Sequence, residues 1–191
     1  MLHRMTRAAD EDLVTRCLGG SDGAFAELVD SYKNLVFGVI SQVVSDKSRV
    51  EDLAQEVFLK VHKGLPSYRG EAKLSTWIYR IVRNVCTDAA VRERPTASLD
   101  ERDAHGKLRY EPVAHDGAFR AAELRDELEH AVSELPVEQR FLISAHYFGG
   151  QQYQELADIL GIPIGTVKTQ LHRAKARLRA RLEQRQGARE F

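Results

Sequence analysis

The chain has 191 residues, of which 43% are hydrophobic and 29% are charged, and its formal net charge is +0 at pH 7. This length suits one domain of average size or two small ones. The composition excludes an integral membrane protein, because no apolar run approaches the roughly 20 residues of a membrane-spanning helix. The first residues also lack the apolar core of a signal peptide, so we expect a cytoplasmic protein.

Helical periodicity dominates the first half of the chain. After Ser21 and Asp22, a good N-cap pair, apolar residues recur at helical spacing from Phe25 to Val44 and predict one long amphipathic helix. A second helix ends at Gly64, and a third is expected from Ser75 to Arg92. The residues expected to face inward on these two helices are Val50, Leu53, Val57, Val61, Ile78, Ile81, Val82, Val85 and Ala89.

The helical pattern stops at Pro95. From there to Gly117 the chain has two prolines, two glycines, many charges and no period, which indicates a linker. A loop of this length is unusual within one compact domain. The sequence therefore predicts a helical domain over residues 1–94, a linker over 95–117 and a second domain over 118–191.

Beyond the linker the same periodicity returns. Four helices are expected, over Ala118–Glu134, Val137–Phe148, Gln152–Leu160 and Ile164–Glu183, and strand alternation is absent from the sequence. The predicted fold class is all-α, with two helical bundles joined by a flexible linker.

The sequence gives no support for a metal or cofactor site. Cys17 and Cys86 are far apart, and no CxxC or His/Cys group has the spacing of a zinc site. We expect two reduced, largely buried thiols, with a redox or metal role as the alternative. An enzyme is disfavoured, because no carboxylate pair, nucleophile–base set or glycine-rich phosphate loop is present.

The segment from Tyr153 to Leu171 fits the helix-turn-helix template. Ala157 stands where two helices approach closely, and Gly161 follows at the turn, where a residue that tolerates positive φ is needed. Apolar residues occupy the positions that pack between the two helices, namely Leu156, Leu160, Ile162 and Val167.

The helix that follows the turn is strongly basic, with no acid between Ile159 and Leu182. An apolar stripe holds it down through Val167, Leu171, Ala174, Leu178 and Leu182, while cationic and hydrogen-bonding side chains face outward. This arrangement is typical of a recognition helix in a major groove. We expect Lys168, Thr169, Gln170 and His172 at base edges, and Arg173, Lys175 and Arg177 at phosphates. The alternative is an ordinary helix with a solvated basic face.

Acidic residues balance this basic helix. Between Ala121 and Asp158 the chain carries eight acids against Arg125 and Arg140 only. The acids are Glu123, Asp126, Glu127, Glu129, Glu134, Glu138, Glu155 and Asp158. The net charge of zero therefore hides a polarised distribution, which matters more for nucleic-acid binding than the sum.

Three stretches, "DLAQEVFLKVHKGLPSY", "YRGEAKLSTWIYRIVRNVCTD" and "GIPIGTVKTQLHRAKARL", resemble the bacterial extracytoplasmic-function (ECF) sigma factors, the two-domain members of the sigma family. The resemblance extends from about Asp12 to Arg181. It implies that the first domain corresponds to sigma region 2 and the last to region 4. It further implies binding to core RNA polymerase, through the β′ clamp helices and the β subunit, and to promoter DNA.

The resemblance assigns "DLAQEVFLK" to the β′ clamp helices, through Asp52, Gln55, Glu56, Phe58 and Lys60. Asp52, Glu56 and Lys60 share one helix face, and an aromatic anchor beside charged residues suits a protein contact. The alternative is an exposed, ion-paired helix with Phe58 in the core.

"YRGEAKLSTWIYRIVRN" resembles the segment that recognises and opens the −10 promoter element. Captured single-stranded bases need aromatic rings for stacking and cations for phosphates. The candidate residues are Tyr68, Arg69, Lys73, Thr76, Trp77, Arg80, Arg83 and Asn84. For Trp77 the alternative is partial burial in the bundle, and Tyr79 is expected to pack.

The sequence thus predicts a promoter-specificity subunit that recognises the −35 element as duplex, melts the −10 element, and is controlled by an anti-sigma factor. It would have no active site and no cofactor. The alternative is a stand-alone helix-turn-helix regulator, which binds duplex DNA without polymerase. Gln152 departs from the family, where Ser or Thr is common, and implies a weaker N-cap.

Overall fold

The computed structural model describes residues 7–92 and 127–187, and the side chains of 185–187 are outside this description. The described ranges consist of helices joined by turns and short irregular segments, without a strand, so the predicted all-α class is confirmed. None of the described helices is both long and apolar enough to cross a membrane. The segment predicted as a linker, 95–117, lies outside the described residues, and the division into domains stays a prediction.

Residues 7–92, called here the first unit, fold as an antiparallel helical bundle. Its α-helices and 3-10 turns are α1 (Arg7–Leu18), α2 (Ala24–Val43), η1 (Lys47–Arg49), α3 (Val50–Gly64), η2 (Leu65–Ser67) and α4 (Leu74–Arg92). α1 was not predicted, since it carries few apolar residues and buries Asp10 beside Leu13 and Val14. α2 begins after Gly23, whose φ is 80°, rather than at Ser21 and Asp22.

Residues 127–187, the second unit, contain the predicted helix-turn-helix. After a helical stretch over 127–133, its elements are α6 (Val137–Ile143), η3 (Ser144–Phe148), α7 (Tyr153–Leu160) and α8 (Ile164–Gly187). The predicted single helix over Val137–Phe148 is α6 continued by η3, a π-helical turn. α8 matches its predicted start at Ile164.

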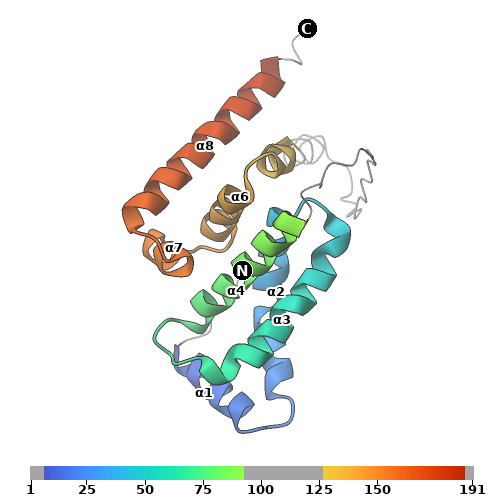
Figure 1. The fold of residues 1–191 in the computed structure, drawn as a ribbon, viewed down its shortest axis with the longest axis vertical. Helices are drawn as coiled ribbons and strands as arrows, with labels where there is room; N and C mark the ends of the chain where they lie inside the picture. Colours follow the sequence, from blue (N-terminus) through green and yellow to red (C-terminus); the bar gives the residue numbers. More distant parts are fainter. Residues whose placement is uncertain (1–6, 93–126, 188–191) are drawn as a thin grey trace, which may run out of the picture.

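The two units pack directly against each other. α2 and α4 of the first unit contact α6 of the second, while α4 also contacts α7 and α2 contacts η3. The buried apolar residues of both units form one continuous core. Figure 1 shows the consequence: α7 and α6 lie beside α4, and α8 lies on the outer side of the molecule.

Candidate nucleic-acid interface

The turn between α7 and α8 depends on Gly161. This residue caps α7 with φ 66° and ψ 33°, a left-handed conformation that side chains other than glycine rarely adopt. Its N–H donates to Ala157 O at 2.8 Å, and Ile162 N donates to the same oxygen at 3.2 Å. Ala157 is buried, as its small side chain allows. The turn therefore fixes the angle at which α8 leaves α7.

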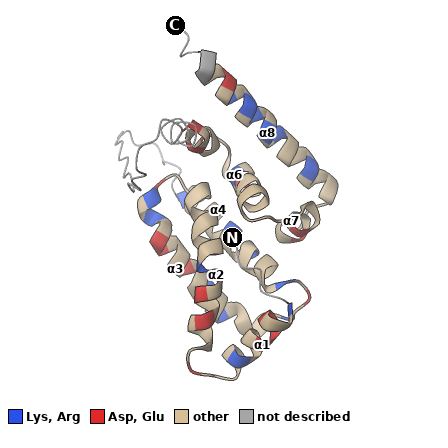
Figure 2. Cartoon of the chain, turned by 180° about the vertical axis from the view of Figure 1, so that it is seen from behind, with Lys and Arg blue, Asp and Glu red and all other residues tan. Residues whose placement is uncertain are grey.

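α8 separates into a buried and an exposed face as predicted. Val167, Leu171, Ala174 and Leu178 are buried, and Leu182 is half-buried. Most of the candidate DNA contacts lie in the open: Lys168, Thr169, His172, Arg173, Lys175 and Arg177 are exposed, and Gln170 is half-buried. Figure 2 shows basic residues along this helix. α8 thus presents cations and hydrogen-bonding groups while an apolar stripe holds it against the second unit.

Some of these α8 side chains have partners within the chain. Thr169 Oγ1 donates to Gly165 O at 2.9 Å, one turn back on the same helix. Arg177 Nη1 donates to Gln139 Oε1 at 3.0 Å. Lys175 lies on the rim of an apolar groove rather than at the centre of the exposed face. The centre of that face is therefore formed by Lys168, His172 and Arg173 and their neighbours.

Glu155 compensates for the weak N-cap residue of α7. Its Oε2 accepts the backbone N–H of Gln152 at 2.9 Å, which is the glutamate half of a capping box. Since the first amides of a helix have no intrahelical acceptor, this bond stabilises the start of α7. The helix-turn-helix is thereby anchored at its first residue as well as at its turn.

α4 and the loop before it carry the candidate −10 residues. Tyr68 and Trp77 are half-buried and pack together, with ring centroids 5.5 Å apart, and Tyr68 Oη donates to Ala72 O at 2.6 Å. Arg69, Lys73, Arg80 and Asn84 are exposed, and Arg83 is half-buried. The indole of Trp77 lies against Gly64, where a Cβ would meet it at 3.0 Å. The sequence-predicted residues are thus gathered on one side of α4.

Three cations of α4 and of the loop before it contact the second unit. Lys73 Nζ lies 2.7 Å from Glu155 Oε1, and Arg83 Nη2 lies 2.8 Å from Glu138 Oε1. Arg80 Nε donates to Asp158 O at 3.0 Å. The acidic residues of the second unit therefore face the basic residues of α4.

α3 exposes the polar face that the sequence predicted. Asp52 and Gln55 are exposed, and Lys60 Nζ lies 2.9 Å from Glu56 Oε1. Lys60 also lies 3.8 Å from Asp88, and Glu56 lies 3.9 Å from Arg92, which connects this face to the end of α4. Glu56 and Lys60 are half-buried, whereas Asp52 and Gln55 are exposed and leave this face accessible to a partner.

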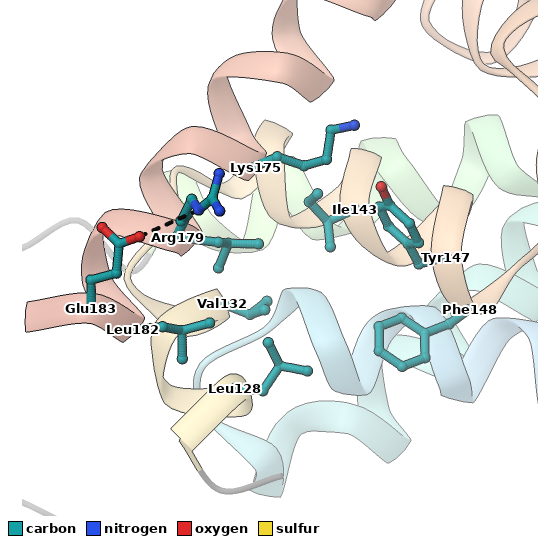
Figure 3. A pocket seen from close by; sticks show the side chains of 10 residues that line it. Leu128, Val132, Ile143, Tyr147, Phe148, Lys175, Arg179, Leu182 and Glu183 are labelled. Atoms are coloured by element: carbon teal, nitrogen blue, oxygen red, sulfur yellow. Dashed lines mark ion pairs between the residues drawn. The ribbon is translucent and has the colours of Figure 1, made fainter. Parts of the chain in front are cut away.

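The second unit also has an apolar groove. Its walls are formed by α8, by residues 127–133 and by the α6–η3 segment, and Figure 3 shows side chains from all three converging on it. Leu128, Tyr147 and Phe148 are 39%, 55% and 50% exposed, unusually high values for side chains of this size. Lys175, Arg179 and Glu183 form its charged rim, where Arg179 pairs with Glu183 at 3.3 Å.

The chain matches two family models. Residues 28–96 match sigma-70 region 2, and residues 125–178 match sigma-70, region 4. It is 32% identical over 170 residues to the ECF RNA polymerase sigma factor SigW of Bacillus subtilis, with 85% of this chain and 91% of SigW covered. It is 31% identical to the ECF RNA polymerase sigma-E factor of Escherichia coli, with 87% of this chain and 90% of that protein covered.

The chain belongs to the ECF sigma factors. The resemblance drawn from the three sequence stretches is confirmed. Solved structures agree on the fold: CnrH in complex with the cytosolic domain of CnrY has a TM-score of 0.66 at 21% identity and covers 92% of this chain and 97% of CnrH. The sigma factor RpoE of Bartonella quintana, in complex with the anti-sigma factor NepR, has a TM-score of 0.63 at 21% identity, with coverage of 84% and 98%.

Two candidate contact residues of this sigma factor do not lie where the sequence analysis expected them. Phe58 was expected beside the exposed polar face of α3, but it is only 9% exposed and belongs to the core, in agreement with the alternative interpretation. The reason is the helix period, which places Phe58 one turn after buried Ala54 and beside Val57. Leu59, which sequence reasoning missed, is the exposed apolar residue of this face, at 55%.

Thr76 was expected opposite the apolar stripe of α4, in the open. It is 3% exposed, because the face that it shares with Lys73 and Arg80 lies against the second unit of the sigma factor. Tyr79 is fully buried, as expected, and its ring packs edge-on against Phe141 with centroids 6.4 Å apart. No local sequence pattern could have placed Thr76 or Phe141 at this contact, since both depend on how the two units meet.

Proposed function

We propose that this sigma factor binds core RNA polymerase through α3, recognises the −35 element with α8, and captures the opened −10 element with α4 and the loop before it. The observation that carries the proposal is the arrangement of α8, whose apolar stripe is buried while Lys168, His172 and Arg173 lie in the open. A helix presented in this way after a fixed turn can enter a major groove.

On α8, position along the helix separates the roles. Lys168, Thr169, Gln170 and His172 follow the turn and are proposed to meet base edges, since the N-terminal part of a recognition helix penetrates deepest. Arg173, Lys175 and Arg177 lie further along and are proposed to bind phosphates. Lys168 in place of arginine offers a point charge without a planar fork, which lowers selectivity for guanine.

For the −10 element, the proposed site is the surface formed by Tyr68, Arg69, Trp77 and Asn84 together with the cations of α4. The packed pair Tyr68 and Trp77 supplies aromatic surface for base stacking. Exposed Arg69 lies at the start of the same loop and supplies positive charge for the DNA backbone.

The proposed core-binding surface of α3 is formed by Asp52, Gln55, Glu56 and Lys60 around exposed Leu59. An apolar side chain surrounded by charged residues is the usual composition of an interface with a polar rim. Phe58 supports this surface from the core rather than contacting the β′ clamp helices itself.

We assign the apolar groove of the second unit to a helix of the polymerase β subunit. An amphipathic helix can lay its apolar side on Tyr147 and Phe148, with its polar side toward the charged rim at Arg179 and Glu183. Replacing Phe148 by serine is expected to weaken core binding, and the matched control is Leu18→Ser, an equally exposed leucine on α1.

An anti-sigma factor is a further proposed partner, since solved relatives of the same fold are described in complexes with CnrY and with NepR. The proposed place of action is the cytoplasm, where polymerase and promoter DNA are found. The proposal gives the chain no catalysis of its own, because the polymerisation chemistry belongs to the core enzyme.

A gel-shift experiment tests the proposal against a stand-alone regulator. Labelled duplex fragments from genomic promoter regions are incubated with the purified chain, with and without core RNA polymerase. We expect a sequence-specific complex only when core enzyme is present, because two weak DNA contacts gain avidity once core spaces them. A specific complex of the chain alone, as a dimer on a two-fold site, would instead establish the regulator.

A further inference from the structure

α1, the helix that the sequence analysis did not predict, touches the loop that precedes α4. Arg7, its first residue, donates from Nη2 to the backbone oxygen of Gly70 at 2.8 Å, across 63 positions of the chain. The same guanidinium donates from Nε to Glu11 Oε1 at 2.9 Å, one turn further along α1. Because a guanidinium is planar and presents its donors in fixed directions, the bond to Glu11 orients it toward the loop.

α1 is itself held against α2. Asp10 is buried, and its Oδ1 accepts a hydrogen bond from Tyr32 Oη at 2.6 Å. Leu13 is completely buried in the core of the first unit. Toward the other end of the helix, Arg16 pairs with Glu27 of α2, with 2.7 Å between Nη1 and Oε2. Since these contacts fix α1 in place, Arg7 meets the loop from a fixed helix rather than from a free chain end.

The contact is made where the loop turns. Gly70 has φ 70°, a left-handed conformation that residues other than glycine rarely adopt. Two residues later, the backbone oxygen of Ala72 accepts the hydrogen bond from Tyr68 Oη, and Tyr68 packs on Trp77. Since the oxygens of Gly70 and Ala72 both have partners, the loop is held in one shape. Arg69 is exposed on this loop, so the direction of its side chain depends on that shape.

We propose that Arg7 is a positioning residue for the −10 element: by binding the oxygen of Gly70, it keeps the loop before α4 in the shape that receives an unpaired base. This rests on the proposed role of α4 and this loop at the −10 element. A loop that is already ordered loses less conformational entropy when it captures a base, so it binds more tightly and selects bases more sharply. Arg7 acts through Gly70 and does not itself contact the DNA.

The Arg7–Gly70 contact can be tested without DNA, because Trp77 is the only tryptophan of the chain and packs on the same loop. Acrylamide quenches tryptophan fluorescence more strongly when the ring becomes more accessible. We expect R7A to raise the quenching constant of Trp77. The matched control is R16A, which removes the same charge from the same helix but from a residue that pairs with Asp12 and Glu27.

A second variant disturbs the same turn from the loop side. A Cβ at position 70 would meet no atom of the described residues within 4 Å, so G70A introduces backbone strain without a clash and without a change of charge. G70A is therefore expected to raise the quenching of Trp77 as R7A does. The double variant R7A/G70A is expected to do little more than either single variant, because both act on one contact.

Base selection is tested on the complex with core polymerase, using a labelled pool of random single-stranded 12-mers. Affinity is measured by fluorescence anisotropy, and the bound fraction is sequenced. We expect R7A and G70A to bind about three- to tenfold more weakly than R16A, the effect of one lost hydrogen bond, and with a weaker base preference. The salt dependence of R7A should match that of R16A, since a lost phosphate contact would reduce its slope by about 0.7.

The outcomes separate the contact, the positioning role and the −10 role. Equal quenching of Trp77 in R7A, R16A and the wild type overturns the contact. A salt slope reduced in R7A but not in G70A or R16A overturns positioning, because Arg7 would then bind a phosphate directly.

The variant R69A, which removes a proposed DNA contact from the same loop, distinguishes the two remaining failures. If R69A weakens binding while R7A and G70A bind and select bases like R16A, positioning is overturned and the −10 role stands. If R69A also binds like R16A, the −10 role of the loop is overturned, and positioning with it, while the Arg7–Gly70 contact stands on the quenching of Trp77.

Discussion

Lys73 and Glu155, which are 82 residues apart in the chain, form an ion pair across the two units, with Nζ and Oε1 2.7 Å apart. The other carboxylate oxygen of Glu155 accepts the Gln152 N–H at the start of α7. One carboxylate therefore stabilises the start of α7 and also contributes to the contact between the two units.

Replacing Glu155 separates these two roles. Alanine removes both interactions and is expected to lower the free energy of unfolding by about 0.5–2 kcal/mol, the usual cost of a lost cap. Glutamine retains the cap oxygen and is expected to cost less than half as much. Urea unfolding of the two variants measures the difference, and equal losses would show that the capping bond contributes nothing.

Gly149 is not expected to tolerate a side chain, because the hydroxyl of Tyr79 occupies the space beside it. The G149A variant places a Cβ where Tyr79 Oη lies and also 2.7 Å from Ala145 O, so we expect a loss of about 1–3 kcal/mol, the usual cost of overpacking. Y79F removes the hydroxyl and should restore part of this loss in the double variant. Strict additivity in a double-mutant cycle, by thermal or urea unfolding, would contradict the contact.

Substitutions of Phe58 and Leu59 are expected to change different properties: the first lowers stability, and the second lowers affinity for core polymerase. F58A removes a core side chain and should cost about 3–5 kcal/mol of stability. L59S removes an exposed side chain, so the free energy of unfolding should change by less than about 0.5 kcal/mol, while core polymerase affinity falls severalfold. Titration of labelled core enzyme, together with urea unfolding, distinguishes the two, and full core affinity of L59S would remove Leu59 from the interface.

Substitutions of Arg173 and Lys168 are expected to change DNA binding in different ways. R173A should weaken −35 binding of the polymerase complex about equally across sequences and reduce the salt slope by about one, as loss of a phosphate contact does. K168A should instead change the preferred sequence at one position. Affinities are measured on a set of single-base variants of a mapped promoter at several salt concentrations, and a sequence-dependent effect of R173A would reverse the assignment.

Asp10 should make stability depend on pH. Its side chain is 5% exposed and accepts a hydrogen bond from Tyr32 Oη at 2.6 Å, and burial raises the pKa of the carboxyl. A raised pKa in the folded state stabilises at low pH and loses this contribution as pH rises through that pKa. Relative to D10N, the wild type is therefore expected to lose stability as the pH rises above about 4, the usual pKa of an aspartate. A relative gain over this range would contradict the burial argument.

The sequence identified the elements whose pattern is local. α8 was predicted with its buried stripe and exposed cations because one face of a regular helix repeats every three to four residues. Gly161 was identified for the same reason, since a turn needs a positive φ at a fixed offset. α1 was missed because only two of its apolar residues, Leu13 and Val14, are buried, and they are adjacent in a helix that is otherwise largely polar.

The contact between the two units could not be predicted from any local sequence pattern. Thr76 is polar and lies among exposed cations, so its burial follows only from the tertiary placement of α7. A signal was nevertheless present, because the acidic segment around Glu138 and Glu155 complements the basic α4. Charge complementarity indicates that two segments attract each other, but not which side chains meet.

The most direct test of the central claim is transcription in vitro by core RNA polymerase on a genomic DNA library, with the 5′ ends of the transcripts mapped. If the chain directs polymerase to promoters, its addition should produce new start sites that share sequence elements near −35 and −10. Start sites identical to those of core enzyme alone would contradict the account.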